Sequence, residues 1–189
     1  MIAIPVPAVM SRLFQQMDVP RDVNDPSDHI TMFYLGDNVS IDRLVQIIPI
    51  LYKACSKISP MKVSCKRITS FPKGEGGYPV IGEIQSKELV SLRDKIRGFL
   101  EQNNIKFDKK HNEYRPHVTL GYSKKKPKNV SFPKVEWTIG EIALYGGDDG
   151  DQRLFVNFPL SLGDKKAMDE LEILVQGYDA AVKSLTRRG

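Results

Sequence analysis

Two stretches of the chain, HITMFYLG at residues 29–36 and HVTLGYS at residues 117–123, begin in the same way. Each starts with histidine and has threonine two positions later, although the chain holds only 3 histidines among 189 residues. Both stretches are rich in β-branched and aromatic residues, as β-strands are. Because side chains alternate between the faces of a strand, each stretch is predicted to pack one apolar face on helices and to present His and Thr together on the other.

Strict alternation also predicts which neighbours share the histidine faces. In the first stretch these are Thr31, Phe33 and Leu35, with Met32 and Tyr34 opposite. In the second stretch they are Arg115, Thr119, Gly121 and Ser123, with Leu120 and Tyr122 opposite. Gly121 suits either a ligand pocket or a β-bulge, and both readings stay open at this point.

The segments around these stretches predict an α+β domain, because strands and helices alternate but hairpins intervene. Residues 2–7 are predicted to form an edge strand, since they contain two prolines. Residues 61–71 and 80–84 are expected to pair across a long loop, and residues 135–145 to form one strand. Helices are expected after Ser40 and Ser86, which are good N-caps, and from about residue 165 to 185.

Composition excludes some classes of protein and permits others. The net charge of +5 allows an anionic partner such as a nucleotide or RNA without requiring one. The chain has 2 cysteines in no spaced cluster, which favours a reducing, cytoplasmic compartment (the host cytoplasm for a viral protein). No stretch approaches the roughly 20 apolar residues of a membrane span, so no membrane partner is expected.

The paired histidines predict chemistry on a phosphate ester. A neutral imidazole can take a proton from an attacking hydroxyl or water, and a protonated one can give a proton to the leaving oxygen. A threonine two residues along can donate to a non-bridging phosphate oxygen. A metal site is disfavoured, because neither motif has a third His, Cys or carboxylate ligand beside it. The competing interpretation is that each histidine is simply a core residue.

The two motifs resemble the signature motifs of the 2H phosphoesterase superfamily, which includes 2′-5′ RNA ligase-like and cyclic phosphodiesterase proteins. Both are complete here, as His29-Ile30-Thr31-Met32 and His117-Val118-Thr119-Leu120, and Pro116 also fits the pattern. The similarity covers residues 1–163. It implies a bilobal fold with two pseudo-symmetric antiparallel sheets and outer helices around a concave cleft. Residues 164–189 are expected to be an added C-terminal helix.

The resemblance implies metal-independent cleavage of 2′,3′-cyclic phosphates, 2′-5′ linkages or cyclic nucleotides, including the signalling nucleotides that viral relatives destroy, with no cofactor. His29 and His117 are expected to share acid and base duties. Thr31 and Thr119 are expected to bind the phosphate of a nucleotide or short RNA. Further substrate contacts are expected from Arg115, Phe33, Tyr78 and Lys124.

Two alternatives remain open at the level of sequence. The same residues would also suit a module that binds nucleotide or RNA without turnover. Alternatively, the chain would be mainly an interaction protein, whose function would be carried by its C-terminal helix. A monomer is expected in each case.

Overall fold

The computed structural model describes residues 1–19, 21–24, 29–37, 39–109, 113–146 and 153–160. These residues form the strands β1 (Ile2–Pro5), β2 (Val23–Asn24), β3 (His29–Phe33), β4 (Met61–Ser70), β5 (Tyr78–Gln85), β6 (His117–Ser123), β7 (Val130–Ile139), β8 (Glu141–Gly146) and β9 (Arg153–Pro159). The helices are α1 (Ala8–Gln15), α2 (Ile41–Cys55) and α3 (Lys87–Gln102). The extension expected at residues 164–189 lies outside the described residues.

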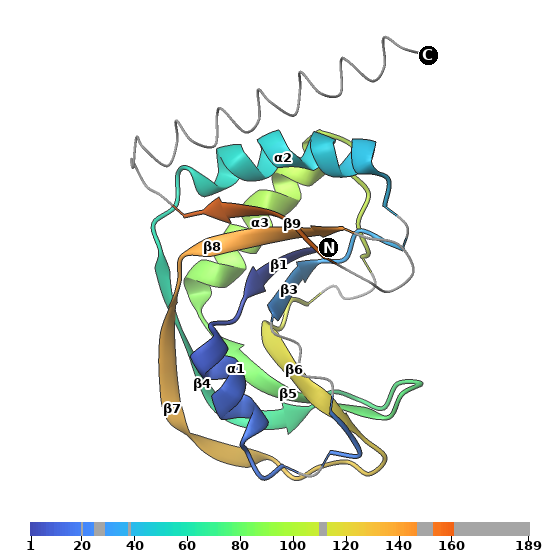
Figure 1. Ribbon diagram of the computed structural model, residues 1–189, viewed down its shortest axis with the longest axis vertical. Helices are drawn as coiled ribbons and strands as arrows, with labels where there is room; N and C mark the ends of the chain where they lie inside the picture. Colours follow the sequence, from blue (N-terminus) through green and yellow to red (C-terminus); the bar gives the residue numbers. More distant parts are fainter. Residues whose placement is uncertain (20, 25–28, 38, 110–112, 147–152, 161–189) are drawn as a thin grey trace.

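The strands form two separate antiparallel sheets, one above the other in Figure 1. The upper sheet has four strands in the order β3-β1-β8-β9, and the lower sheet has five in the order β2-β6-β5-β4-β7. This arrangement confirms the α+β prediction and the expectation of two antiparallel sheets. Each sheet contains one of the two His-x-Thr strands, β3 in the upper sheet and β6 in the lower.

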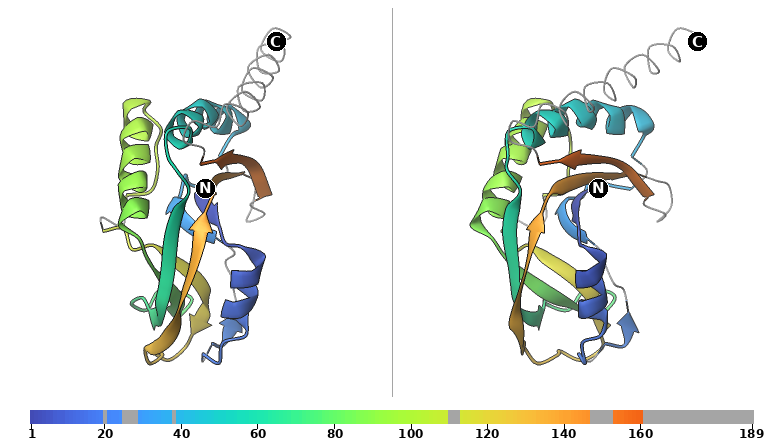
Figure 2. Two further views of the ribbon diagram at one scale, coloured as in Figure 1. Left: turned by 90° about the vertical axis from the view of Figure 1, so that its left-hand side faces the viewer. Right: turned by 60° about the vertical axis from the view of Figure 1, so that its left-hand side comes forward.

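The three helices bury apolar faces against the sheets. Helices α2 and α3 pack on each other, α2 also lies against β8 and β9, and α3 contacts β4. Helix α1 lies beside the lower sheet (Figure 2). Phe14 of α1 meets Trp137 of β7 edge to face, with 6.2 Å between the ring centres. Buried residues of both sheets and all three helices belong to one hydrophobic cluster, so the halves share a core.

Several local predictions are confirmed. Ser40 accepts a hydrogen bond from the Arg43 amide at the start of α2, and Ser86 accepts one from the Leu89 amide at the start of α3. Strands β4 and β5 pair as a long-looped hairpin. These features depend on residues close in sequence, which is why local patterns find them.

Two local predictions are wrong. Strand β1 is not an edge strand, because it pairs with β3 on one side and β8 on the other. Proline has no backbone N–H to donate to a neighbouring strand. Because only Ile2 and Ala3 pair with β8, Pro5 lies outside that ladder and no hydrogen bond to β8 is lost. Residues 135–145 are not one strand, since the chain leaves the lower sheet at Ile139 and enters the upper sheet at Glu141, with Gly140 between.

Candidate active site

The two His-x-Thr strands lie side by side where the sheets meet. Strand β3 is the edge of the upper sheet, and β6 is flanked in the lower sheet only by the two-residue β2 on one side and by β5 on the other. The strands contact each other, as Figure 1 also shows, but they belong to different sheets. Folding therefore places the strand that carries His29 and Thr31 in contact with the strand that carries His117 and Thr119, although the two motifs are far apart in sequence.

Both strands contain a bulge at the same position of the motif. Ala3 pairs with Thr31 and Ile2 with Phe33, which leaves Met32 as an extra residue in β3. Ile81 pairs with Thr119 and Val80 with Gly121, which leaves Leu120 as an extra residue in β6. In each strand the bulged residue directly follows the threonine. A bulge changes which face the following side chains occupy.

The burial of the two stretches repeats residue by residue. From His29 to Leu35 and from His117 to Ser123 the order is half-buried, buried, half-buried, buried, buried, half-buried, buried. His and Thr are the half-buried residues before each bulge, and Tyr34 and Tyr122 are the half-buried residues after it. The strict alternation expected from sequence therefore holds up to the threonines and is wrong beyond them.

The presence of glycine at position 121 is explained by the bulge rather than by a ligand pocket. Its φ is +146°, and a Cβ there would lie 2.2 Å from the carbonyl oxygen of Val23 in β2. A side chain would thus meet both an unfavourable backbone conformation and a neighbouring strand. Of the two readings of this glycine, the structure supports the bulge.

The register of the lower sheet defines the face on which His117 lies. His117 pairs with Glu83, Thr119 with Ile81, and Tyr122 with Pro79, so these residues share one face. We call it the β6 motif face. Tyr78 pairs with Ser123 on the opposite face. Tyr122 thus lies on the motif face, whereas Tyr78, the expected substrate contact, does not.

His117 is held in one orientation by its neighbours. Its Nδ1 lies 2.7 Å from the carbonyl oxygen of Arg115, which places a proton on Nδ1 because a carbonyl can only accept. The Phe71 ring packs edge to face against the imidazole at 4.7 Å. Nε2 is then the nitrogen left to exchange protons, as an acceptor when the ring is neutral and a donor when it is protonated.

A charged network adjoins His117 on the β6 motif face. The Glu83 carboxylate accepts from Arg67 Nε at 2.9 Å and from Arg115 Nη2 at 3.3 Å. The Arg115 guanidinium also lies 5.1 Å from the centre of the Phe71 ring. Arg115 therefore lies beside Glu83 on the face of His117, and its charge is partly balanced by that carboxylate.

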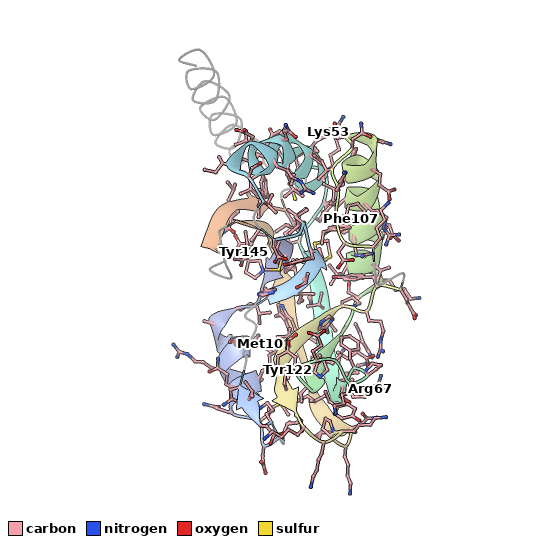
Figure 3. All side chains as sticks on the ribbon, turned by 90° about the vertical axis from the view of Figure 1, so that its right-hand side faces the viewer. Met10, Lys53, Arg67, Phe107, Tyr122 and Tyr145 are labelled. Atoms are coloured by element: carbon pink, nitrogen blue, oxygen red, sulfur yellow. The ribbon has the colours of Figure 1, made fainter. Side chains whose placement is uncertain are left out.

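The surroundings of His29 differ from those of His117. The Tyr145 ring of β8 lies 6.0 Å from the imidazole, tilted by 39°. The Thr31 hydroxyl donates to the Met1 sulfur at 3.6 Å, and a thioether is a weak acceptor. Figure 3 labels Tyr145, the neighbour of His29, in the upper half of the molecule and Tyr122, on the β6 motif face, in the lower.

Two other expected substrate contacts lie away from the histidine and threonine side chains. Phe33 is 2% exposed, and its ring packs against Phe107 and the Arg93 guanidinium, so it cannot stack on a ligand. The bulge at Met32 turns it into the core. Lys124 directly follows β6 and is exposed; its backbone amide donates to the Asp22 carboxylate at 2.6 Å.

Sequence reasoning missed Phe71, Glu83 and Tyr145 as neighbours of the histidines. Glu83 and Tyr145 lie on strands, and Phe71 directly follows β4. All three are distant in sequence from the histidine that they adjoin, so only the pairing of the strands could have found them. Among the described residues, no three His, Cys, Asp or Glu side chains are grouped to hold a metal ion, and no helix is long and apolar enough to cross a membrane.

Known protein structures share this fold. TT0787 of Thermus thermophilus superposes with a TM-score of 0.71 at 17% identity, over 86% of this chain and 97% of that one. E. coli LigT in its complex with 3′-AMP gives 0.62 at 16% identity, over 84% and 95%. The LigT complex with ATP gives 0.55 at 17% identity, over 85% and 96%. No curated protein matches the sequence of this chain.

The family model of the 2′-5′ RNA ligase superfamily matches residues 14–151, which contain both His-x-Thr motifs. Together with the two antiparallel sheets and the matched motif strands, this match shows that the chain belongs to the 2′-5′ RNA ligase superfamily of 2H phosphoesterases.

Proposed function

We propose that this protein is a metal-independent phosphodiesterase that cleaves 2′,3′-cyclic phosphates, 2′-5′ linkages or cyclic nucleotides. One observation carries the proposal: the fold places two His-x-Thr motifs, each followed by a bulge and equal in burial, on strands in contact. A phosphoryl group between them would meet an imidazole and a hydroxyl from either side. Two-sided contact of this kind suits in-line displacement, in which the entering and leaving oxygens lie on opposite sides of phosphorus.

His29 and His117 divide the proton transfers in this proposal. The neutral imidazole accepts a proton as the water oxygen bonds to phosphorus. The protonated imidazole donates its proton to the leaving ribose oxygen as the P–O bond breaks, so charge and protons balance over one turnover. The Thr31 and Thr119 hydroxyls donate to the non-bridging oxygens, where negative charge gathers. These steps require no metal or other cofactor.

The aromatic side chains on the motif faces favour a nucleotide over a simple phosphate ester. Tyr145 beside His29 and Tyr122 in line with Thr119 present partly exposed rings, on which bases can stack. E. coli LigT binds 3′-AMP and ATP in structures of this fold, which supports a nucleotide or short RNA substrate. We also infer a cytoplasmic location, where the buried free thiols of Cys55 and Cys65 would stay reduced.

The test is a panel of 2′,3′-cyclic nucleotides, 2′-5′ oligoadenylates, cyclic dinucleotides and RNA with a cyclic phosphate end, assayed with and without EDTA. We expect turnover of at least one substrate, unchanged by EDTA. His29→Ala and His117→Ala should each reduce kcat by about 10²- to 10⁴-fold, the usual contribution of a positioned acid or base.

Circular dichroism and thermal unfolding of both variants serve as controls for the fold. Tight nucleotide binding without product over hours would instead identify a binding module. Loss of activity in EDTA, restored by a divalent metal, would contradict the proposed mechanism.

A further inference from the structure

The carbonyl of each bulged residue is bound by an arginine from outside its own strand pair. Arg93 Nε in α3 donates to the Met32 carbonyl at 3.1 Å. Arg21 Nη1, in the segment before β2, donates to the Leu120 carbonyl at 3.2 Å. Met32 and Leu120 occupy equivalent positions, one residue after Thr31 and Thr119. Two arginines unrelated in sequence position thus make the same contact in the two halves.

Arg93 is held tightly in the interior. It is 7% exposed, and its guanidinium lies 4.9 Å from the centre of the Phe33 ring and 4.4 Å from that of Tyr114. Burying a charge is costly unless its partners are well placed. Burial lowers the pKa of Arg93, because it disfavours the charged form of the side chain. The other buried residues of α3 are leucines and an isoleucine, so Arg93 is the charged residue on an otherwise apolar face.

Arg21 makes three hydrogen bonds to the backbone and so joins three segments. Besides the Leu120 carbonyl, it donates through Nη2 to the carbonyls of Gln15 at 3.1 Å and Met17 at 3.3 Å. The end of α1 and the bulge of β6 are therefore held by one side chain. Arg21 and Thr119 also line the same small depression, which places this contact next to the motif.

Tyr114 connects the two halves directly. Its hydroxyl donates to the Thr31 carbonyl at 3.2 Å, and it lies three residues before His117. Burial raises the pKa of Tyr114 well above its usual value, so the hydroxyl keeps its proton and remains a donor. Because β3 and β6 share no ladder of backbone hydrogen bonds, contacts of this kind must set the offset between the motifs.

We propose that Arg93 and Arg21 are matched positioning residues, which fix the two bulges and thereby aim the His-x-Thr motifs at one phosphoryl group, with Tyr114 setting the offset between the motifs. A bulge leaves its extra residue unpaired and disrupts the ladder locally, so the backbone groups there need partners from elsewhere. Misplacing a catalytic group by about 1 Å can cost about 100-fold in rate. This inference rests on the proposed phosphodiesterase function.

The test compares Arg93→Met, Arg21→Met and Tyr114→Phe with the matched controls Arg97→Met in α3, Arg12→Met in α1 and Tyr52→Phe in α2. The first readout is kcat and KM on the best substrate of the panel, measured well below the unfolding temperature. We expect kcat to fall about 100-fold for Arg93→Met and about 10-fold for the other two test variants, with KM within about threefold. The controls should stay near the parent.

The second readout does not depend on turnover. Inorganic phosphate is titrated into each protein while the imidazole resonances of His29 and His117 are followed by NMR. In the parent, one phosphate should shift both resonances with a single affinity. In the three test variants, we expect weaker binding and a shift confined to one histidine.

The outcomes separate the two proposals. If the parent has no turnover but phosphate shifts both histidines and the variants uncouple them, the proposed function fails and the positioning role stands. If the parent turns over and the variants lose only thermal stability, with kcat and phosphate titration unchanged, the positioning role is wrong. Arg93→Lys and Arg21→Lys, which retain a positively charged donor group, should recover part of the lost kcat.

Discussion

The two motif strands are alike in sequence pattern, bulge and burial, but they differ in what surrounds them. His117 lies on a strand paired on both sides, and its Nδ1 is fixed by the Arg115 carbonyl and its ring by Phe71. His29 begins an edge strand and has the Tyr145 ring as its aromatic neighbour at 6.0 Å. Glu83, Arg67 and Arg115 form an ion-pair network on the β6 motif face, whereas Thr31, near His29, donates to the Met1 sulfur.

This comparison separates the features that both halves share from the features that only one half has. The shared elements are histidine, threonine and a bulge bound by arginine, and in the proposed mechanism the first two contact the phosphoryl group. The differing elements, Glu83 with its two arginines and the tyrosines, break the symmetry. An asymmetric surrounding fits the proposed mechanism, in which the two imidazoles begin turnover in opposite protonation states.

Among the substitutions that compare the two halves, the largest effect should come from the threonines, which test whether the halves contribute equally. Thr31→Val and Thr119→Val each remove a hydroxyl and nearly conserve volume. We expect kcat to fall about 10- to 100-fold in each, because a donor to the transition-state oxygens is lost. Steady-state kinetics measure this.

The matched control for the threonines is Thr69→Val, whose hydroxyl is bound to Asn129 at 2.7 Å and lies two strands from β6. A tenfold loss in one motif variant and none in the other would show that only one half binds the phosphate.

The next prediction concerns Gly121, which has Phe33 as its counterpart after the bulge of β3. Gly121→Ala should destabilise the fold by about 2 kcal/mol or more, because φ is +146° and the new Cβ would lie 2.2 Å from the Val23 carbonyl oxygen. Urea unfolding measures the change. Gly98→Ala in α3, where nothing lies within 4 Å, is the control and should stabilise by about 0.5 kcal/mol. Equal stability of the two variants would show that β2 does not hold the β6 bulge.

Local sequence pattern predicted much of this molecule, because helix caps, the β4–β5 hairpin and the apolar side of each motif depend on near neighbours. The His-x-Thr pairs were found for the same reason, since their alternation precedes the bulges. What lay beyond Met32 and Leu120 was not predictable, because a bulge is decided by pairing with β1 and β5. Phe33 and Tyr122 were assigned to the wrong faces on that account.

Long-range pairing limited the rest of the prediction in the same way. The apolar run of residues 135–145 reads as one strand, and only the presence of two sheets explains the break at Gly140. Arg93 lies at helical spacing from the core residues of α3, but a charged side chain is usually expected at the surface. Its reason to be buried is the Met32 carbonyl, which is 61 positions away.

The smallest effect should come from substitution of Glu83, which tests whether the charges around His117 distinguish the two halves. Glu83→Gln leaves Arg67 and Arg115 without their shared carboxylate on the face of His117, which disfavours the protonated imidazole. We expect the rate to fall about fivefold if His117 must be protonated to act, and to change little if it acts as the base. Glu136→Gln on β7, which removes an exposed pair with Lys134, should change nothing in either case. The rate measured across pH 5 to 8 thus assigns the acid to β6 or to β3, and equal rates for both glutamine variants at every pH would place the acid on His29.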